Sequence, residues 1–218
     1  LDKAYQSGYY DAMVNLVRGL FGRALKTNSS LYFAVLTGCL RISRESIFTG
    51  FNNFNVYTVQ NVRYNEFFGF TDKEVRKMLN DYGFEGQYSA VKEWYDGYRF
   101  GNLAIYCPWD VVRYCDDLRD GNAVEPQNYW VNTSSNDIVR KFIEKADAAA
   151  KDEIERLVSG GSITKKIKQE LTYRDLDSQI DNLWSILFTT GYLTQRGKAE
   201  TGAAELVIPN KEIRWIFT

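Results

Sequence analysis

The stretch Leu31-Tyr32-Phe33-Ala34-Val35-Leu36-Thr37-Gly38 decides how this sequence is expected to fold. A short run of consecutive apolar residues that ends at a glycine turn is typical of a strand covered on both faces in a parallel sheet. Just upstream, apolar residues recur every three or four positions over residues 9–26, which predicts an amphipathic helix. A helix that leads into a parallel strand implies an earlier strand in the same sheet. We therefore expect the chain to begin inside a βαβ unit and to belong to a longer protein.

A second strand of the same sheet is predicted at residues 54–59, because Phe-Asn-Val-Tyr-Thr-Val alternates and is rich in β-branched and aromatic residues. From Thr71 onward the pattern becomes helical. Thr71, with Glu74 three residues later, has the pattern of an N-terminal capping box, and this helix should end near Gly83. Apolar spacing predicts further helices at residues 87–94, 109–118 and 137–158.

The last part of the chain mixes both types of element. A strand is predicted at residues 163–167 and a helix at 179–190, and residues 192–195 and 205–208 should pair as two strands. Helices followed by a two-stranded wing indicate a winged-helix-like module. We predict a mixed α/β, helix-rich fold in three parts, which are an α/β core, a helical domain and a winged-helix-like module at residues 1–70, 71–160 and 161–218.

Composition excludes several classes of protein. The chain has 218 residues, 44% of them hydrophobic, so it can bury a sizeable core. Its net charge of −1 gives no overall attraction to nucleic acid or to anionic membranes, and no apolar run approaches the roughly 20 residues of a membrane span. Three cysteines without a CxxC pair fit a reducing cytoplasm better than a secreted disulfide framework. The absence of histidine excludes His-based triads and His-ligated zinc, and no metal site is predicted.

A complete phosphate-binding site is missing from the sequence. Such a loop needs GxxxxGK followed by Ser or Thr, so that backbone N–H groups surround the phosphates while the Lys and the hydroxyl meet phosphate and Mg²⁺. Residues 159–166 (Ser-Gly-Gly-Ser-Ile-Thr-Lys-Lys) lack this order and are better explained as a glycine-rich boundary. No buried-strand pattern ends in an acid suited to Mg²⁺. The chain by itself should therefore not bind nucleotide or act as an enzyme.

Thr37 is the first candidate site residue, because it ends the predicted central strand at the edge where open α/β sheets bind ligands. Its hydroxyl could orient a water or contact a terminal phosphate, and a structural role before the Gly38 turn is equally compatible with the pattern. Arg41 and Arg44 follow closely and could supply positive charge to a phosphoryl group, although solvated surface arginines are the more common outcome.

Two other groups of residues have both a binding and a structural interpretation. Residues 94–101 (Trp-Tyr-Asp-Gly-Tyr-Arg-Phe-Gly) could hold a base or sugar on aromatic rings with Arg99, but an aromatic turn that packs a hairpin against a helix is the favoured interpretation. Lys165, Lys166 and Lys168 could contact a nucleic-acid backbone. Lysines that protect an exposed edge strand explain the same pattern, and this interpretation is favoured.

Four ordered blocks together resemble the bacterial AAA-ATPase-like family. These blocks are residues 36–53 (Leu-Thr-Gly-Cys-Leu-Arg-Ile-Ser-Arg-Glu-Ser-Ile-Phe-Thr-Gly-Phe-Asn-Asn), 94–101, 129–136 (Tyr-Trp-Val-Asn-Thr-Ser-Ser-Asn) and 208–212 (Ile-Pro-Asn-Lys-Glu). The resemblance extends over nearly the whole chain, and four blocks in the same order are far more specific than one glycine motif.

The resemblance implies a P-loop ATPase core, a helical lid and a winged-helix-like end, often followed by a nuclease-like domain of the PD-(D/E)xK type. It also implies that the Walker A and Walker B elements, which bind ATP and Mg²⁺, precede Leu1. Thr37, with Arg41 nearby, would then occupy the sensor position, and Arg44 and Arg99 are weaker candidates for contact with nucleotide. The alternative hypothesis is a nucleic-acid-binding or regulatory module, with DNA as the partner and a vestigial ATPase. A third possibility is a small-ligand-binding protein that uses the aromatic rings of residues 94–100.

Overall fold

The computed structural model describes most of the chain in two compact units. The first unit contains Leu1–Val56 and Lys168–Thr190, and the second contains Tyr57–Ile167 and Gly191–Thr218. The residues described are 4–5, 7–26, 28–38, 54–121, 125–130, 146–168, 180–197 and 203–217.

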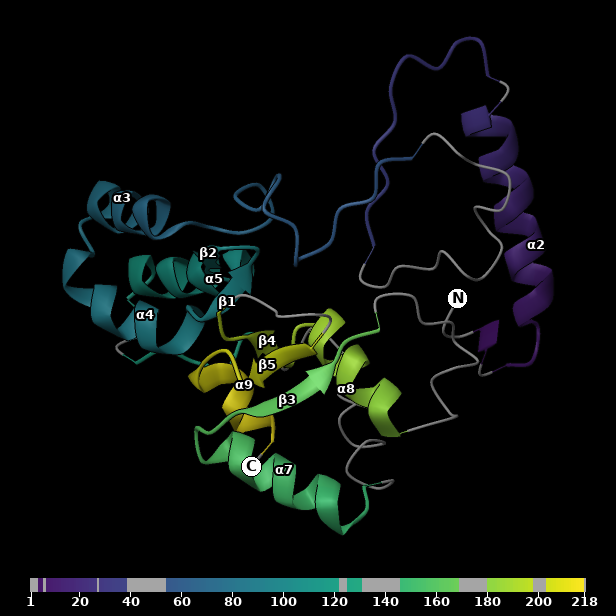
Figure 1. Ribbon diagram of the computed structural model, residues 1–218. Coiled ribbons are helices and arrows are strands. Elements are labelled where there is room, and N and C mark those ends of the chain that lie inside the picture. The colour runs from purple at the N-terminus through teal and green to yellow at the C-terminus, as the bar shows by residue number, and fades with distance from the viewer. Residues whose placement is uncertain are drawn as a thin grey trace. The chain divides into compact units, whose positions relative to one another are not determined.

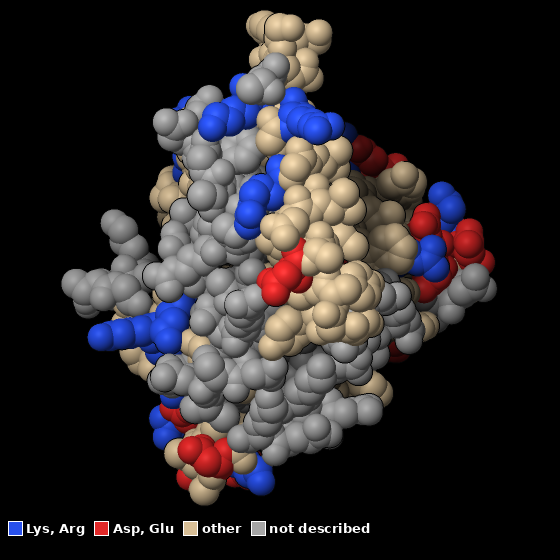
Figure 2. Space-filling model, turned by 90° about the vertical axis from the view of Figure 1, so that its right-hand side faces the viewer, with Lys and Arg blue, Asp and Glu red and all other residues tan. Residues whose placement is uncertain are grey.

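The secondary-structure elements described in the first unit are helices. Helix α2 (Tyr10–Phe21) continues as a π-helical turn, η1 (Gly22–Lys26), which confirms the helix predicted at residues 9–26. Tyr10 and Val14 are buried on the inner face of α2, as the helical spacing of apolar residues requires. Figure 2 turns α2 toward the reader, and Lys and Arg gather toward its C-terminal end, where they complement the helix dipole.

Helix α8 (Ile180–Thr189) completes the described part of the first unit and confirms the helix predicted at residues 179–190. Most of its side chains are buried, including Trp184 and Leu187. The backbone N–H of Lys168 donates to Ser185 Oγ at 3.0 Å, and Lys168 Nζ donates to Asn182 Oδ1 at 2.8 Å. These two bonds hold the approaching chain against α8.

The strand predicted at residues 31–36 is wrong. Residues 31–38 form no strand, and their apolar side chains are exposed, with Tyr32 101% and Phe33 76% accessible. The strand predicted at residues 54–59 is also wrong, because Asn61 Oδ1 accepts from the Thr58 N–H at 2.7 Å and closes a turn there. A strand needs hydrogen bonds to a neighbouring strand, and the described part of the first unit contains none that could pair with residues 31–36.

The second unit begins with a helical layer around a short hairpin. Its helices are α3 (Asp72–Tyr82), the 3₁₀ turn η2 (Glu85–Gln87), α4 (Tyr88–Tyr95) and α5 (Pro108–Arg119), and its strands are β1 (Tyr98–Phe100) and β2 (Leu103–Ile105). The two strands pair antiparallel, with Arg99 opposite Ala104. Val75, Leu79, Val91 and Tyr95 form the centre of the core between these helices, and they are completely or almost completely buried.

The second unit also contains a three-stranded antiparallel sheet with two helices beside it (Figure 1). Strand β5 (Ala203–Val207) lies between β3 (Ile163–Lys166) and β4 (Thr194–Gln195), with Ile163 opposite Leu206. Helix α7 (Ala148–Val158) lies beside β3, and α9 (Lys211–Ile216) lies beside α4.

The sequence predictions for the second unit are confirmed for α3 with its capping box, α4, α5, β3 and the pairing of β4 with β5. Helix α7 confirms the end of the helix predicted at residues 137–158, and residues 137–145 lie outside the described part. The mixed α/β, helix-rich class is therefore confirmed. The P-loop core and the winged-helix-like module stay predictions. No helix in the described ranges is both long and apolar enough to cross a membrane.

Candidate functional site

Three of the four sequence blocks meet in the second unit. A Cβ on Gly97 would lie 1.8 Å from the carbonyl oxygen of Pro209, so these two backbone segments are in direct contact. The backbone N–H of Trp130 donates to Glu212 Oε1 at 2.8 Å. Residues 94–101, 129–130 and 208–212 therefore form one packed cluster, which we call the motif junction. The block at residues 36–53 lies mostly outside the described residues.

Helix α5 contributes Asp110, whose carboxyl group interacts with that of Glu212 in the motif junction. Asp110 is 2% exposed and Glu212 is completely buried, and each carboxyl group shifts the pKa of the other. Asp110 Oδ1 and Glu212 Oε2 meet no protein donor. Two ionised carboxylates offer only acceptors, so a hydrogen bond between these two buried groups requires a proton on one of them. The pair is thus a carboxyl–carboxylate pair enclosed by protein.

Burial is the main reason that the pKa values of both carboxyl groups are raised, because a buried carboxylate loses its hydration. Burial, followed by the nearby charge of Asp110, raises the pKa of Glu212 to about 8, against an opposing effect of the Trp130 N–H. Burial also raises the pKa of Asp110, although hydrogen bonds from Cys107 and Glu212 oppose that shift. At neutral pH the pair therefore holds one shared proton.

The surroundings of the pair are uncharged. Burial raises the pKa of the Cys107 thiol, and it also raises the pKa of Tyr98, so both groups remain neutral. The groups that act on Asp110 are Cys107 and Glu212, and neither of them is a cation. Such a pair resembles an acid/base dyad in composition, but its complete burial denies contact to a substrate. We conclude that its role is to hold the motif junction together.

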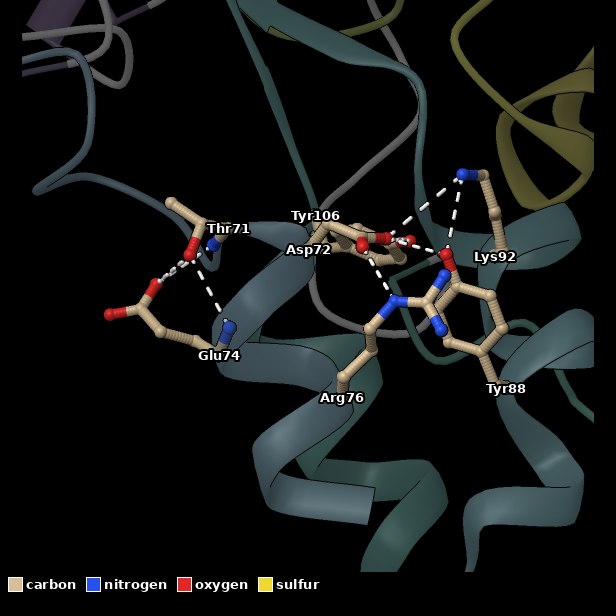
Figure 3. Close-up of polar contacts among 7 residues, drawn as sticks. All are labelled: Thr71, Asp72, Glu74, Arg76, Tyr88, Lys92 and Tyr106. Carbon is tan, nitrogen blue, oxygen red and sulfur yellow. Dashed lines mark hydrogen bonds and ion pairs between the residues drawn. The ribbon is translucent and has the colours of Figure 1, made fainter. Parts of the chain in front are cut away.

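A second polar cluster centres on Asp72, at the first turn of α3 (Figure 3). Asp72 Oδ1 accepts hydrogen bonds from the hydroxyls of Tyr88 at 2.6 Å and Tyr106 at 2.8 Å, and Arg76 Nε lies 2.7 Å from Oδ2. Burial alone would raise the pKa of Asp72, but these bonds outweigh it and lower the pKa to about 2. The cluster connects α3 to α4 and to the residue after β2, which is a structural role.

The predicted nucleotide-site residues are distributed over both units. Thr37 is exposed on an irregular segment of the first unit, and Arg41 and Arg44 lie outside the described residues. In the second unit, the backbone N–H of Arg99 donates to Thr194 Oγ1 at 2.9 Å and connects β1 to β4. Arg99 Nε is buried without a hydrogen-bond partner. No described contact therefore gives Arg99 or Thr37 a catalytic role, and both stay predictions.

The three lysines predicted to bind nucleic acid contact other protein groups or lie on or next to an edge strand. Lys165 Nζ lies 2.8 Å from Glu153 Oε2, and Lys168 contacts Asn182, whereas Lys166 is exposed. Strand β3 is an edge of the three-stranded sheet. This position agrees with lysines that protect an edge strand. The ion pair between Lys165 and Glu153 reduces the positive charge that this strand offers to a DNA backbone.

The aromatic block at residues 94–101 is largely packed. Tyr95 is completely buried, and its hydroxyl donates to the Gln127 carbonyl at 2.9 Å. The Tyr98 hydroxyl donates to the carbonyl of Gly191 at 3.0 Å, and Lys211 Nζ lies 4.9 Å from the centre of the Trp94 ring. These contacts favour the aromatic-turn interpretation over an open platform for a base or sugar.

Metal binding is not apparent in the described ranges. Within them, no three Cys, Asp or Glu side chains lie together in an arrangement that could hold an ion. The nucleotide-bound Mg²⁺ of the sequence hypothesis stays a prediction.

Comparison with known proteins gives one distant relative. No family model matches the chain. A protein of Azotobacter chroococcum mcd 1, described as "Uncharacterized protein in vnfD 5'region", is 22% identical over 201 residues, which cover 91% of this chain and 36% of that protein. The chain thus spans about a third of the length of this relative. No solved structure matches.

Proposed function

We propose that this chain is the sensor and lid part of an ATP-binding, ATP-hydrolysing P-loop protein. The observation that carries the proposal is the set of four ordered blocks that resemble the bacterial AAA-ATPase-like family. Three of these blocks, which are far apart in sequence, meet at the motif junction through Gly97, Trp130 and Glu212. A chance likeness would have no reason to select segments that contact each other in space.

In this proposal the predicted lid and the predicted winged-helix-like module have different tasks. Residues 71–160 act as the helical lid and residues 161–218 as the winged-helix-like module, and the motif junction connects the two parts. Thr37 and Arg41 act in the sensor position of the ATPase core. The exposed side chain of Thr37 is compatible with this task, since a residue that contacts a phosphate must be accessible. ATP and Mg²⁺ bind to Walker elements upstream of Leu1.

Calorimetry with ATP and Mg²⁺ tests the proposal. We expect negligible binding to residues 1–218 and clear binding to the protein extended upstream of Leu1. In the extended protein, Thr37→Ala should lower kcat about 10- to 100-fold while ATP affinity changes little, because a sensor acts mainly on the transition state. Thr164→Ala, at an exposed position of β3, is the matched control and should leave kcat unchanged. An extended protein that binds no ATP would refute the proposal.

A further inference from the structure

Asp110 and Glu212 are two buried carboxyl groups that come from two different helices, and each shifts the pKa of the other. Asp110 belongs to the first turn of α5 and Glu212 to the first turn of α9. Glu212 also accepts the backbone N–H of Trp130 through Oε1, so the same side chain holds residues 129–130. The pair thus fastens α9 and residues 129–130 to α5.

Among the described groups that interact with the pair, no cation balances its negative charge. The titratable side chains that interact with it are neutral, and they are Tyr95 of α4, Tyr98 of β1 and Cys107, the residue before α5. The cations of α9 have other partners, since Lys211 Nζ lies 3.2 Å from Glu93 Oε1 and Arg214 Nη1 donates to the Val158 carbonyl at 3.1 Å. Only a proton can therefore relieve the repulsion between the two carboxyls.

We propose that Asp110 and Glu212 form a pH-dependent switch that keeps α9 and residues 129–130 on α5 while the pair holds a proton and loosens them as that proton is lost. In the open state both carboxyls reach water and ionise like ordinary acids. The closed state then binds one proton more than the open state over the pH range between the ordinary pKa and the raised pKa of Glu212. Because of this difference, rising pH favours opening by about tenfold per pH unit within that range.

The backbone contacts at the start of α9 determine which segments would move when Glu212 is released. Asn210 caps α9 by accepting the Ile213 N–H at 3.0 Å, so the helix begins directly beside Pro209. Pro209 is the residue that contacts Gly97. Release of Glu212 would therefore loosen α9 together with the contact between the blocks at residues 94–101 and 208–212. This switch needs no nucleotide and does not depend on the proposed ATPase function.

Hydrogen–deuterium exchange of residues 1–218 between pH 5.5 and pH 9, corrected for intrinsic exchange rates, tests the switch. We expect the opening equilibrium of α9 to rise about tenfold per pH unit up to about pH 7.5 and to level off above about pH 8. Amides of α3, which carries neither Asp110 nor Glu212, should not follow this rise. A carbon-13 NMR titration of the Glu212 carboxyl should show the same midpoint as the change in exchange.

Two variants separate the switch from a general loss of stability. Glu212→Gln keeps the acceptor for the Trp130 N–H and supplies an amide donor to Asp110, so it closes the contact without a proton and should remove the pH-dependent rise in α9. Asp110→Asn should do the same and replaces the first variant if that one folds poorly. Glu93→Gln, at an exposed position, should keep the rise. An opening equilibrium of α9 that is constant with pH in the parent chain, or that rises equally in both variants, would overturn the proposal.

Discussion

Gly97 and Pro209 approach each other so closely that a side chain cannot fit between them. A Cβ on Gly97 would lie 1.8 Å from the Pro209 carbonyl oxygen and 2.7 Å from its carbonyl carbon. The φ angle of Gly97 is +109°, which residues with side chains rarely adopt. Both the contact and the conformation therefore require glycine in this block of the motif junction.

Gly97→Ala should lower the free energy of unfolding by at least about 3 kcal/mol, because the added methyl group meets a backbone carbonyl that cannot move away cheaply. Urea unfolding of the parent and variant chains, followed by circular dichroism, measures the difference. The matched control is Gly83→Ala at the C-terminus of α3, where φ is +75° and a Cβ would have no atom within 4 Å. That variant should lose only about 1 kcal/mol. Equal losses in the two variants would show that the contact with Pro209 contributes nothing.

The N-terminal cap of α3 provides a second prediction. Thr71 Oγ1 accepts the Glu74 N–H at 3.4 Å, and Glu74 Oε2 accepts the Thr71 N–H at 2.8 Å. Thr71→Ala removes one half of this capping box and should cost about 1 kcal/mol in urea unfolding, whereas Thr71→Ser keeps the hydroxyl and should cost much less. A serine variant as unstable as the alanine variant would mean that the methyl group of Thr71, not its hydroxyl, stabilises the helix.

The success of the sequence predictions depends on whether local residues determine the structure. The capping box of Thr71 and Glu74 is a local pattern, and α3 begins and ends where the sequence indicates. Residues 31–36 have an equally clear apolar pattern and form no strand, because a strand also requires a neighbour that lies elsewhere in the chain. Local patterns therefore predicted helices and short antiparallel pairs, and they failed for the strands assigned to a parallel sheet.

The Asp110–Glu212 pair was missed for a related reason. Asp110 lies in the first turn of α5 after Pro108, where an acid is expected simply because it complements the helix dipole. In the sequence, Glu212 is only the last residue of the block at residues 208–212. Their burial follows from the packing of α9 near α4 and α5, which no local pattern encodes. The one available indication was that the block at residues 208–212 carries an acid next to apolar residues.

Asp72 predicts how the second unit responds to acid. Its lowered pKa of about 2 means that the folded state holds the charged carboxylate more strongly than the unfolded state, whose ordinary value is 3.8. The stabilisation is therefore fully present above pH 3.8 and is lost as the pH falls toward 2. A shift of this size corresponds to about 2 kcal/mol, but the side chain is 43% exposed, so screening by water should reduce the contribution to about 1 kcal/mol.

Asp72→Asn removes this titration and leaves one acceptor for the hydroxyls of Tyr88 and Tyr106. We expect the variant to be about 1 kcal/mol less stable than the parent at pH 6 in urea unfolding, and the two stabilities should converge below pH 3. The matched control is Asp81→Asn, which removes an exposed ion pair with Lys77 on the same helix and should change stability by less than about 0.5 kcal/mol. If the difference between Asp72→Asn and the parent stayed constant from pH 6 to pH 2, the hydrogen bonds from Tyr88 and Tyr106 would not depend on the charge of Asp72.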